Sequence, residues 1–248
     1  MQPAEVTSPR IMQSERGEKM DELFEERWKS IFKNHVAKVQ ELDEDTQILS
    51  WKEEGRTIYS LEFIFRNNMI FVSGDLGYGV FYTTWYPKWD YDWEHTNVGY
   101  FAEKCQCVKN GIYVWDEQKG IENLKESYNY AFNDEEYDEI FEAVNDLAEG
   151  WSWNCWDLVK EEKVFIDHED DIELLKQMWC ALNAIHGSSS QEEYAYTLNS
   201  DDDFEDFNDF WEWGYNAGRI LNGYFTIWII ALRMAKEQLL AKGYGGKK

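Results

Sequence analysis

The sequence is short of proline, cysteine and basic side chains, and each shortage excludes a class of protein. Only 3 of the 248 residues are proline, so no long proline-rich linker is present. The cysteines Cys105, Cys107, Cys155 and Cys180 do not make a disulfide framework in a chain this long. The longest largely apolar run, Tyr224–Leu232, is too short to cross a bilayer. With no signal peptide recognisable at the start, we expect a protein of a reducing cytoplasm.

Positive charge is the largest shortage. The chain has 24 Lys and Arg against 49 Asp and Glu, a formal net charge of -25. Nucleic-acid phosphates are bound through Lys and Arg, so we expect no direct nucleic-acid binding, and anionic membranes would be repelled. The charge would attract a basic partner, including a protein surface that normally holds nucleic acid. The simpler interpretation is that the charge only keeps the protein soluble.

The negative charge is concentrated in one part of the chain. Residues 101–213 carry 30 acidic and 7 basic side chains. The last stretch, 214–248, carries 1 acidic and 6 basic side chains. This asymmetry favours one charged face over uniform solubilisation.

Aromatic residues are plentiful, at 17% with 13 Trp, so the chain can build a sizeable core. Apolar residues at three- and four-residue spacings predict a helix from Ser14 to about Val36. Short apolar runs joined by tight turns then predict an antiparallel meander, with strands at 48–53, 57–66, 69–73 and 79–85. Caps and periodicity predict helices at 97–109, 117–131, 134–149, 170–185, 202–216 and 218–241.

The predicted fold class is α+β, with a small antiparallel meander of about four strands. One N-terminal helix precedes the sheet, and a mainly helical acidic segment follows it. We expect a flexible tail at 1–13, then the helix and sheet over 14–115. Residues 116–248 are expected to pack on the sheet in one compact unit.

The run SGDLGYG at residues 73–79 raises the question of a phosphate-binding loop. A Walker loop ends in Lys followed by Ser or Thr, and a dinucleotide fingerprint opens a helix. Here Gly74, Gly77 and Gly79 precede a strand, no lysine is present, and Asp75 would repel phosphate. The run is therefore interpreted as a turn between two strands.

Two further groups of polar residues suggest chemistry. In YPKWDYDWE and the following His95, carboxylates alternate with rings, as in sites that cleave or bind sugars. The alternative is an acidic loop whose rings pack on the sheet. The run DHEDD at 167–171 is rich in oxygen ligands but lacks the spacing of a calcium loop, so we expect no metal site and no cofactor.

Two acidic amphipathic segments, at 134–146 and 200–213, are the more specific signal. Each places aromatic or aliphatic residues at helical spacing and crowds the rest of the surface with carboxylates. Such a row of carboxylates can imitate a phosphate backbone, although an ordinary solvated face remains the alternative. The predicted partner-contact residues are Asp134, Glu135, Glu136, Asp138, Asp201, Asp202, Asp203, Glu205, Asp206 and Asp209, with Trp89, Trp93 and Trp151 as aromatic anchors.

Two stretches, FVSGDLGYGVFYTTW followed by NVGYFAEKC and the C-terminal GYFTIWIIALRMAKEQL, resemble a group of uncharacterised phage and prophage proteins. The resemblance covers about half the chain and brings no catalytic residues with it. It implies a phage origin and expression inside a bacterial cell. Small acidic phage proteins without a catalytic motif are often inhibitors of host enzymes or defence systems, an argument by association.

These observations predict a non-enzymatic phage inhibitor that binds the basic surface of a bacterial defence complex. One alternative is a carbohydrate- or small-ligand-binding protein, or a hydrolase, that uses loop 86–95. A second alternative is a virion structural or assembly protein, which would carry a self-complementary apolar interface. Charge and composition leave a homo-oligomer open.

Overall fold

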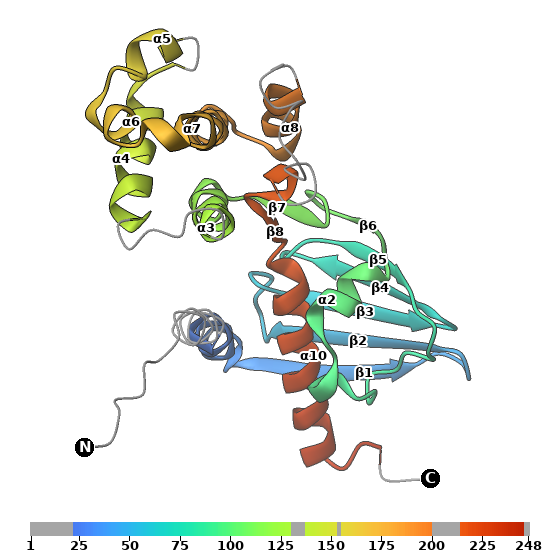
Figure 1. Cartoon of the computed structure of the whole chain (residues 1–248). Helices are drawn as coiled ribbons and strands as arrows, with labels where there is room; N and C mark the ends of the chain where they lie inside the picture. Colours follow the sequence, from blue (N-terminus) through green and yellow to red (C-terminus); the bar gives the residue numbers. More distant parts are fainter. Residues whose placement is uncertain (1–21, 130–136, 153–154, 200–213, 246–248) are drawn as a thin grey trace, which may run out of the picture. The chain divides into compact units, whose positions relative to one another are not determined.

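The computed structural model describes residues 22–129, 137–152, 155–199 and 214–245 (Figure 1). The chain divides into two compact units. The first consists of residues 1–112 and 221–248 and is called the sheet unit here. The second consists of residues 113–220 and is called the helical unit. The segment 116–248 is therefore shared between the two units.

The sheet unit contains a six-stranded sheet in which strands neighbour one another in the order of the sequence. Every neighbouring pair is antiparallel. In β3, Leu61, Phe63 and Phe65 are buried while the residues between them face outward, which is the period of two that a strand imposes. The strands are β1 (His35–Glu41), β2 (Thr46–Glu53), β3 (Leu61–Arg66), β4 (Met69–Gly74), β5 (Gly79–Tyr82) and β6 (Cys105–Val108).

The buried face of this sheet is covered by α10 (Tyr224–Ala241), which crosses the strands with α2 (Val98–Glu103) beside it (Figure 1). Phe225, Trp228 and Leu232 of α10 are fully buried. They share one core with Phe63, Phe81 and the other inward residues of the strands. Helical residues 22–32 add Phe32 to the same core. α10, near the end of the chain, thus completes a core whose other residues come from the first 112 residues.

The glycine-rich run forms the turn between β4 and β5, as predicted. Gly74 has φ of 133° and Gly77 has φ of 94°, values that L side chains rarely adopt. The Asp75 carboxylate accepts a hydrogen bond of 2.8 Å from the backbone N–H of Tyr59. The Asp75 N–H in turn donates to the carbonyl of Ser60 at 3.0 Å. Asp75 therefore ties this turn to the loop that precedes β3.

We expect Gly74→Ala to lower the free energy of unfolding by about 2–4 kcal/mol, through strained φ and a steric clash together. A Cβ at this position would lie 2.2 Å from the Ser60 carbonyl oxygen. The control is Gly55→Ala, since Gly55 also has positive φ (76°) but meets nothing within 4 Å. Urea unfolding gives the loss in free energy of unfolding for each variant, and the difference between the two losses measures the cost of the clash. Equal losses would contradict the close approach.

The α+β class and the antiparallel sheet are confirmed, but the expected number of about four strands is too low. The predicted N-terminal helix was extended too far, because the described helix ends at residue 32 and β1 begins at His35. Val36 has helical spacing to Phe32, yet its strand pairs with β2 over its whole length. Residues 105–108, predicted within a helix, form β6, because pairing with β5 overrides local helical preference.

The helical unit is built around α7 (Ile172–His186). Leu175, Met178, Trp179 and Leu182 of this helix are fully buried in a second core. The helix contacts both α3 and α4. The other helices are α3 (Glu117–Tyr128), α4 (Tyr137–Gly150), α5 (Trp156–Val159), α6 (Lys163–Asp167) and α8 (Gln191–Asn199), while β7 (Tyr113–Trp115) and β8 (Arg219–Leu221) pair in a two-stranded sheet. None of the helices in the described ranges is long and apolar enough to cross a membrane.

Candidate functional site: an acidic surface on α3 and α4

Almost all of the net charge belongs to the helical unit. Residues 113–220 contain 29 acidic and 6 basic side chains, a net charge of -23. The sheet unit holds the remaining 20 acidic and 18 basic side chains, a net charge of -2. The two units therefore differ sharply in the electrostatic field that each presents to a partner.

The six basic side chains of the helical unit are all engaged within that unit. Two lie over aromatic rings, Lys176 at 5.7 Å from the Trp156 ring centre and Arg219 at 3.7 Å from that of Tyr113. The other four pair with carboxylates at 2.6–3.7 Å; they are Lys119, Lys125, Lys160 and Lys163. Because these 6 basic side chains stand against 29 acidic ones, the unit keeps a large excess of negative charge.

Helix α4 presents its carboxylates in a row. Its buried face consists of Tyr137, Ile140, Phe141, Val144 and Ala148, all at most 4% exposed. The opposite face carries four exposed carboxylates at spacings of four, four and three residues, which we call the acidic row: Asp138, Glu142, Asp146 and Glu149. At a rise of about 1.5 Å per residue, neighbours in this row lie about 4.5–6 Å apart along the helix axis.

Helix α3 lies beside the acidic row and is joined to it by Lys125. The Lys125 ammonium lies 2.6 Å from a Glu142 oxygen and 3.3 Å from an Asp138 oxygen. Partial burial lowers the pKa of Lys125, but its hydrogen bonds to Glu142 and Asp138 outweigh this effect, so the pKa is raised overall. The Tyr137 hydroxyl also donates to the Lys125 carbonyl at 2.7 Å. These contacts fix α3 against α4, and Glu117, Glu122 and Glu126 extend the exposed negative surface along α3.

His186, at the end of α7, connects three helices. Its Nδ1 lies 2.9 Å from a Glu117 carboxylate oxygen of α3, and its Nε2 lies 3.1 Å from Oδ1 of Asn145 in α4. The His186 side chain is only 13% exposed. A neutral imidazole has one N–H and donates to one of these oxygens, whereas an imidazolium donates to both. Through these contacts the ring links α7 to the acidic helices α3 and α4.

A hollow of about 410 Å³ opens where α4 and α7 end. The amide of Asn183 on α7 donates to the carbonyl of Ala148 at 2.7 Å and also to the carbonyl of Trp151. These bonds bind the last turn of α4 to α7. The hollow is lined by Ala148, Glu149, Gly150, Trp151, Ser152, Asn183, Ala184, His186, Gly187 and Thr197.

The structure locates only some of the predicted contact residues. Asp138 is exposed in the acidic row, and Trp151 is 40% exposed beside the hollow. Both side chains therefore belong to the exposed surface of the helical unit. Asp134, Glu135, Glu136, Asp201, Asp202, Asp203, Glu205, Asp206 and Asp209 lie outside the described residues.

Trp89 and Trp93 were wrongly expected to be exposed anchors. They are 3% and 0% exposed, respectively. The Trp93 indole N–H donates to the carbonyls of Lys88 and Trp89 at 3.2 and 3.1 Å, and its ring packs on Tyr91 and Phe65. Burial of these two large apolar rings in the core stabilises the sheet unit, which exposing them to solvent would not do.

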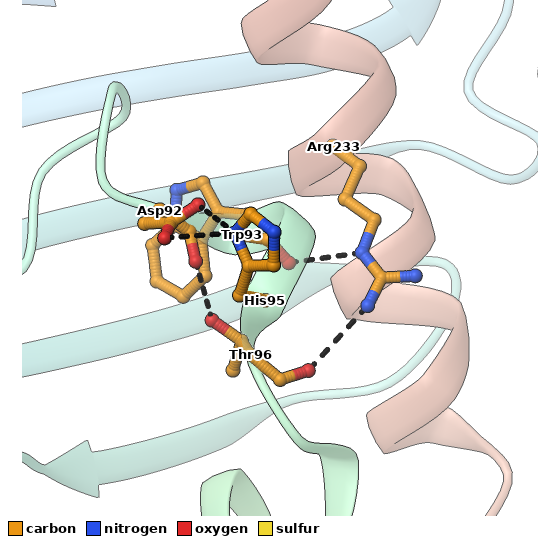
Figure 2. A network of polar contacts seen from close by, with 5 residues as sticks. All are labelled: Asp92, Trp93, His95, Thr96 and Arg233. Atoms are coloured by element: carbon orange, nitrogen blue, oxygen red, sulfur yellow. Dashed lines mark hydrogen bonds and ion pairs between the residues drawn. The ribbon is translucent and has the colours of Figure 1, made fainter.

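The aromatic–acidic loop is held in place by the C-terminal helix (Figure 2). Arg233 of α10 donates from Nε to the Trp93 carbonyl at 2.9 Å and from Nη2 to the Thr96 carbonyl at 3.4 Å. Asp92 accepts from the His95 ring at 3.0 Å, and this hydrogen bond lowers the pKa of Asp92. Trp89 and Trp93 of this loop pack inward, so they are not free to stack on a sugar, whereas Tyr86 is 40% exposed.

Sequence reasoning did not single out His186, Glu142, Asp146 or Glu149 as site residues. The three carboxylates were detectable, since they follow Asp138 at helical spacing on a predicted helix. His186 was not, because its partners lie 41 and 69 residues away in the sequence. Within the described ranges, no cluster of three or more His, Cys, Asp or Glu side chains is arranged to hold a metal ion.

Comparison with known proteins gives no further guidance. No protein-family model matches the chain, and neither a curated protein nor a solved structure matches it.

Proposed function

We propose that this chain is a phage-encoded, non-enzymatic inhibitor that binds a nucleic-acid-handling protein complex of bacterial defence. Binding takes place through the acidic surface of the helical unit. The observation that carries this proposal is the net charge of -23 on residues 113–220, whose few cations are already engaged within the unit. The phage origin and the defence target rest on the sequence resemblance.

The geometry of α4 suits imitation of a phosphate backbone. Neighbouring carboxylates of the acidic row lie about 4.5–6 Å apart along the helix axis. The row therefore presents a line of regularly spaced negative charges, as a DNA strand does at the closer spacing of one charge per about 3.4 Å of helix axis. Because the opposite face of α4 is buried in the second core, the row is held rigid before a partner arrives. A preorganised row loses less conformational entropy on binding than flexible acidic chains do.

The two alternatives rest on weaker observations. A sugar-binding or hydrolytic role needs accessible rings beside carboxylates, whereas Trp89 and Trp93 are buried. An assembly protein needs an apolar self-complementary interface, whereas the helical unit would repel a second copy of itself through its charge. Binding of a basic partner instead uses the exposed carboxylates of the helical unit.

Affinity capture from a bacterial lysate treated with nuclease tests the proposal. We expect the immobilised protein to retain a nucleic-acid-binding complex at about 0.15 M salt, and added double-stranded DNA or RNA to release it. Release by nucleic acid is the decisive result, because it shows that this protein and nucleic acid compete for the same basic surface of the partner. Retention of no nucleic-acid-binding protein, or of a complex that nucleic acid does not displace, would contradict the proposal.

A further inference from the structure

We propose that the hollow between the ends of α4 and α7 binds one arginine side chain of the protein partner. This inference rests on the proposed function and specifies which side chain the helical unit receives. The hollow has a volume of about 410 Å³, and every residue that lines it belongs to the helical unit. Among the residues that the structure describes, no Lys or Arg lines the hollow.

The electrostatics of the hollow favour a cation. α4 ends at Gly150 and α7 ends at His186, so two helix C-termini, each with a partial negative charge, border the same space. Glu149, the last member of the acidic row, adds a full negative charge at the rim. His186 does not oppose a cation strongly, because its Nδ1 lies against the Glu117 carboxylate.

Trp151 makes the hollow selective for arginine over other cations. Its indole is 40% exposed, and among the residues that the structure describes no other ring or cation is in contact with it. Its backbone is fixed, because its N–H donates to the Leu147 carbonyl and its carbonyl accepts from Asn183. A planar guanidinium stacks on such a ring while its five N–H donors reach carbonyl and carboxylate oxygens. An ammonium is more strongly hydrated and has no planar face to stack.

A blocked arginine tests this binding in isolation. The full-length chain, labelled with ¹⁵N, is titrated with Nα-acetyl-arginine methylamide, and blocked citrulline serves as the uncharged control of nearly the same shape. We expect the Trp151 indole resonance to shift in a saturable manner with arginine and to stay unchanged with citrulline. Glu149→Gln is expected to weaken the arginine affinity at least threefold without unfolding the protein. No shift with arginine, or an equal shift with citrulline, would overturn the proposal.

The same site is then tested in the complex with the captured partner. Trp151→Ala is expected to raise the Kd for that partner at least tenfold, as the loss of an aromatic anchor does. If neutralising the acidic row weakens the complex but Trp151→Ala does not, the proposed binding of arginine in the hollow is wrong and the proposed function stands. If blocked arginine binds the hollow but no nucleic-acid-binding partner is captured, the proposed function fails and the arginine site is retained.

Discussion

Trp228→Ala is expected to lower the free energy of unfolding by about 3–5 kcal/mol, the usual cost of truncating a buried tryptophan. Trp228 is 0% exposed, and its ring centre lies 5.8 Å from that of Phe81 and 5.6 Å from that of Phe225. Its indole N–H donates to the Leu76 carbonyl at 3.0 Å, inside the glycine-rich turn. The substitution therefore leaves a cavity and an unpaired carbonyl where α10 meets the sheet.

Hydrogen exchange measures the loss of stability in each unit separately, at the β3 and β4 amides for Trp228→Ala and at the α7 amides for Trp151→Ala. Trp151→Ala is the matched control, because the same change at a 40% exposed ring should cost less than about 1 kcal/mol. A loss at Trp228 no larger than at Trp151 would contradict the role of α10 as the cover of the sheet.

Neutralising the acidic row is expected to weaken the captured complex by about 1–4 kcal/mol, or roughly 5- to 800-fold in Kd. The variant combines Asp138→Asn, Glu142→Gln, Asp146→Asn and Glu149→Gln. Each exposed ion pair that a partner forms with the row contributes modestly, but four lie on one rigid helix. Removing like charges three and four residues apart relieves repulsion within α4, but it also removes the ion pairs of Lys125 with Asp138 and Glu142. Because partly exposed ion pairs contribute modestly to stability, the variant should remain folded, which circular dichroism checks. Isothermal titration calorimetry with the captured complex measures the change.

A second variant with the same change in net charge separates position from total charge. It neutralises four exposed carboxylates of the sheet unit, Glu44, Glu62, Glu103 and Glu237. We expect its Kd to stay within about threefold of the unmodified protein, because these groups do not face the partner. Equal weakening by both variants would show that net charge alone drives binding, and the acidic row would lose its assigned role.

The fold was predictable where local chemistry decides it. The turn at residues 73–79 was recognisable because glycines in an apolar setting supply positive φ. β1 and β6 were missed because their neighbours in the sheet, rather than their own residues, impose the extended conformation. Residues 116–248 were expected to pack on the sheet, but the sequence did not identify α10 as the helix that does so through Trp228, because Trp228 and Leu76 are 152 residues apart.

The candidate site was predictable only in part. The acidic bias and the helical spacing around Asp138 are properties of the sequence itself and indicated the exposed carboxylates of α4. The burial of Trp89 and Trp93 was not visible, because an aromatic next to carboxylates occurs both at surfaces and at the edge of a core. The hollow beside Trp151 depends on where two helices end relative to each other, which the spacing of residues does not specify.

The dependence of the partner's affinity on salt tests the central claim most directly. Raising salt from 0.1 M to 1 M shortens the screening length from about 10 Å to about 3 Å. If the carboxylates of the helical unit occupy a basic surface, the Kd should rise steeply, by roughly tenfold or more, and the neutralised acidic row should flatten this dependence. A Kd that stays constant across this range, or an equal dependence in the acidic-row variant, would contradict the account.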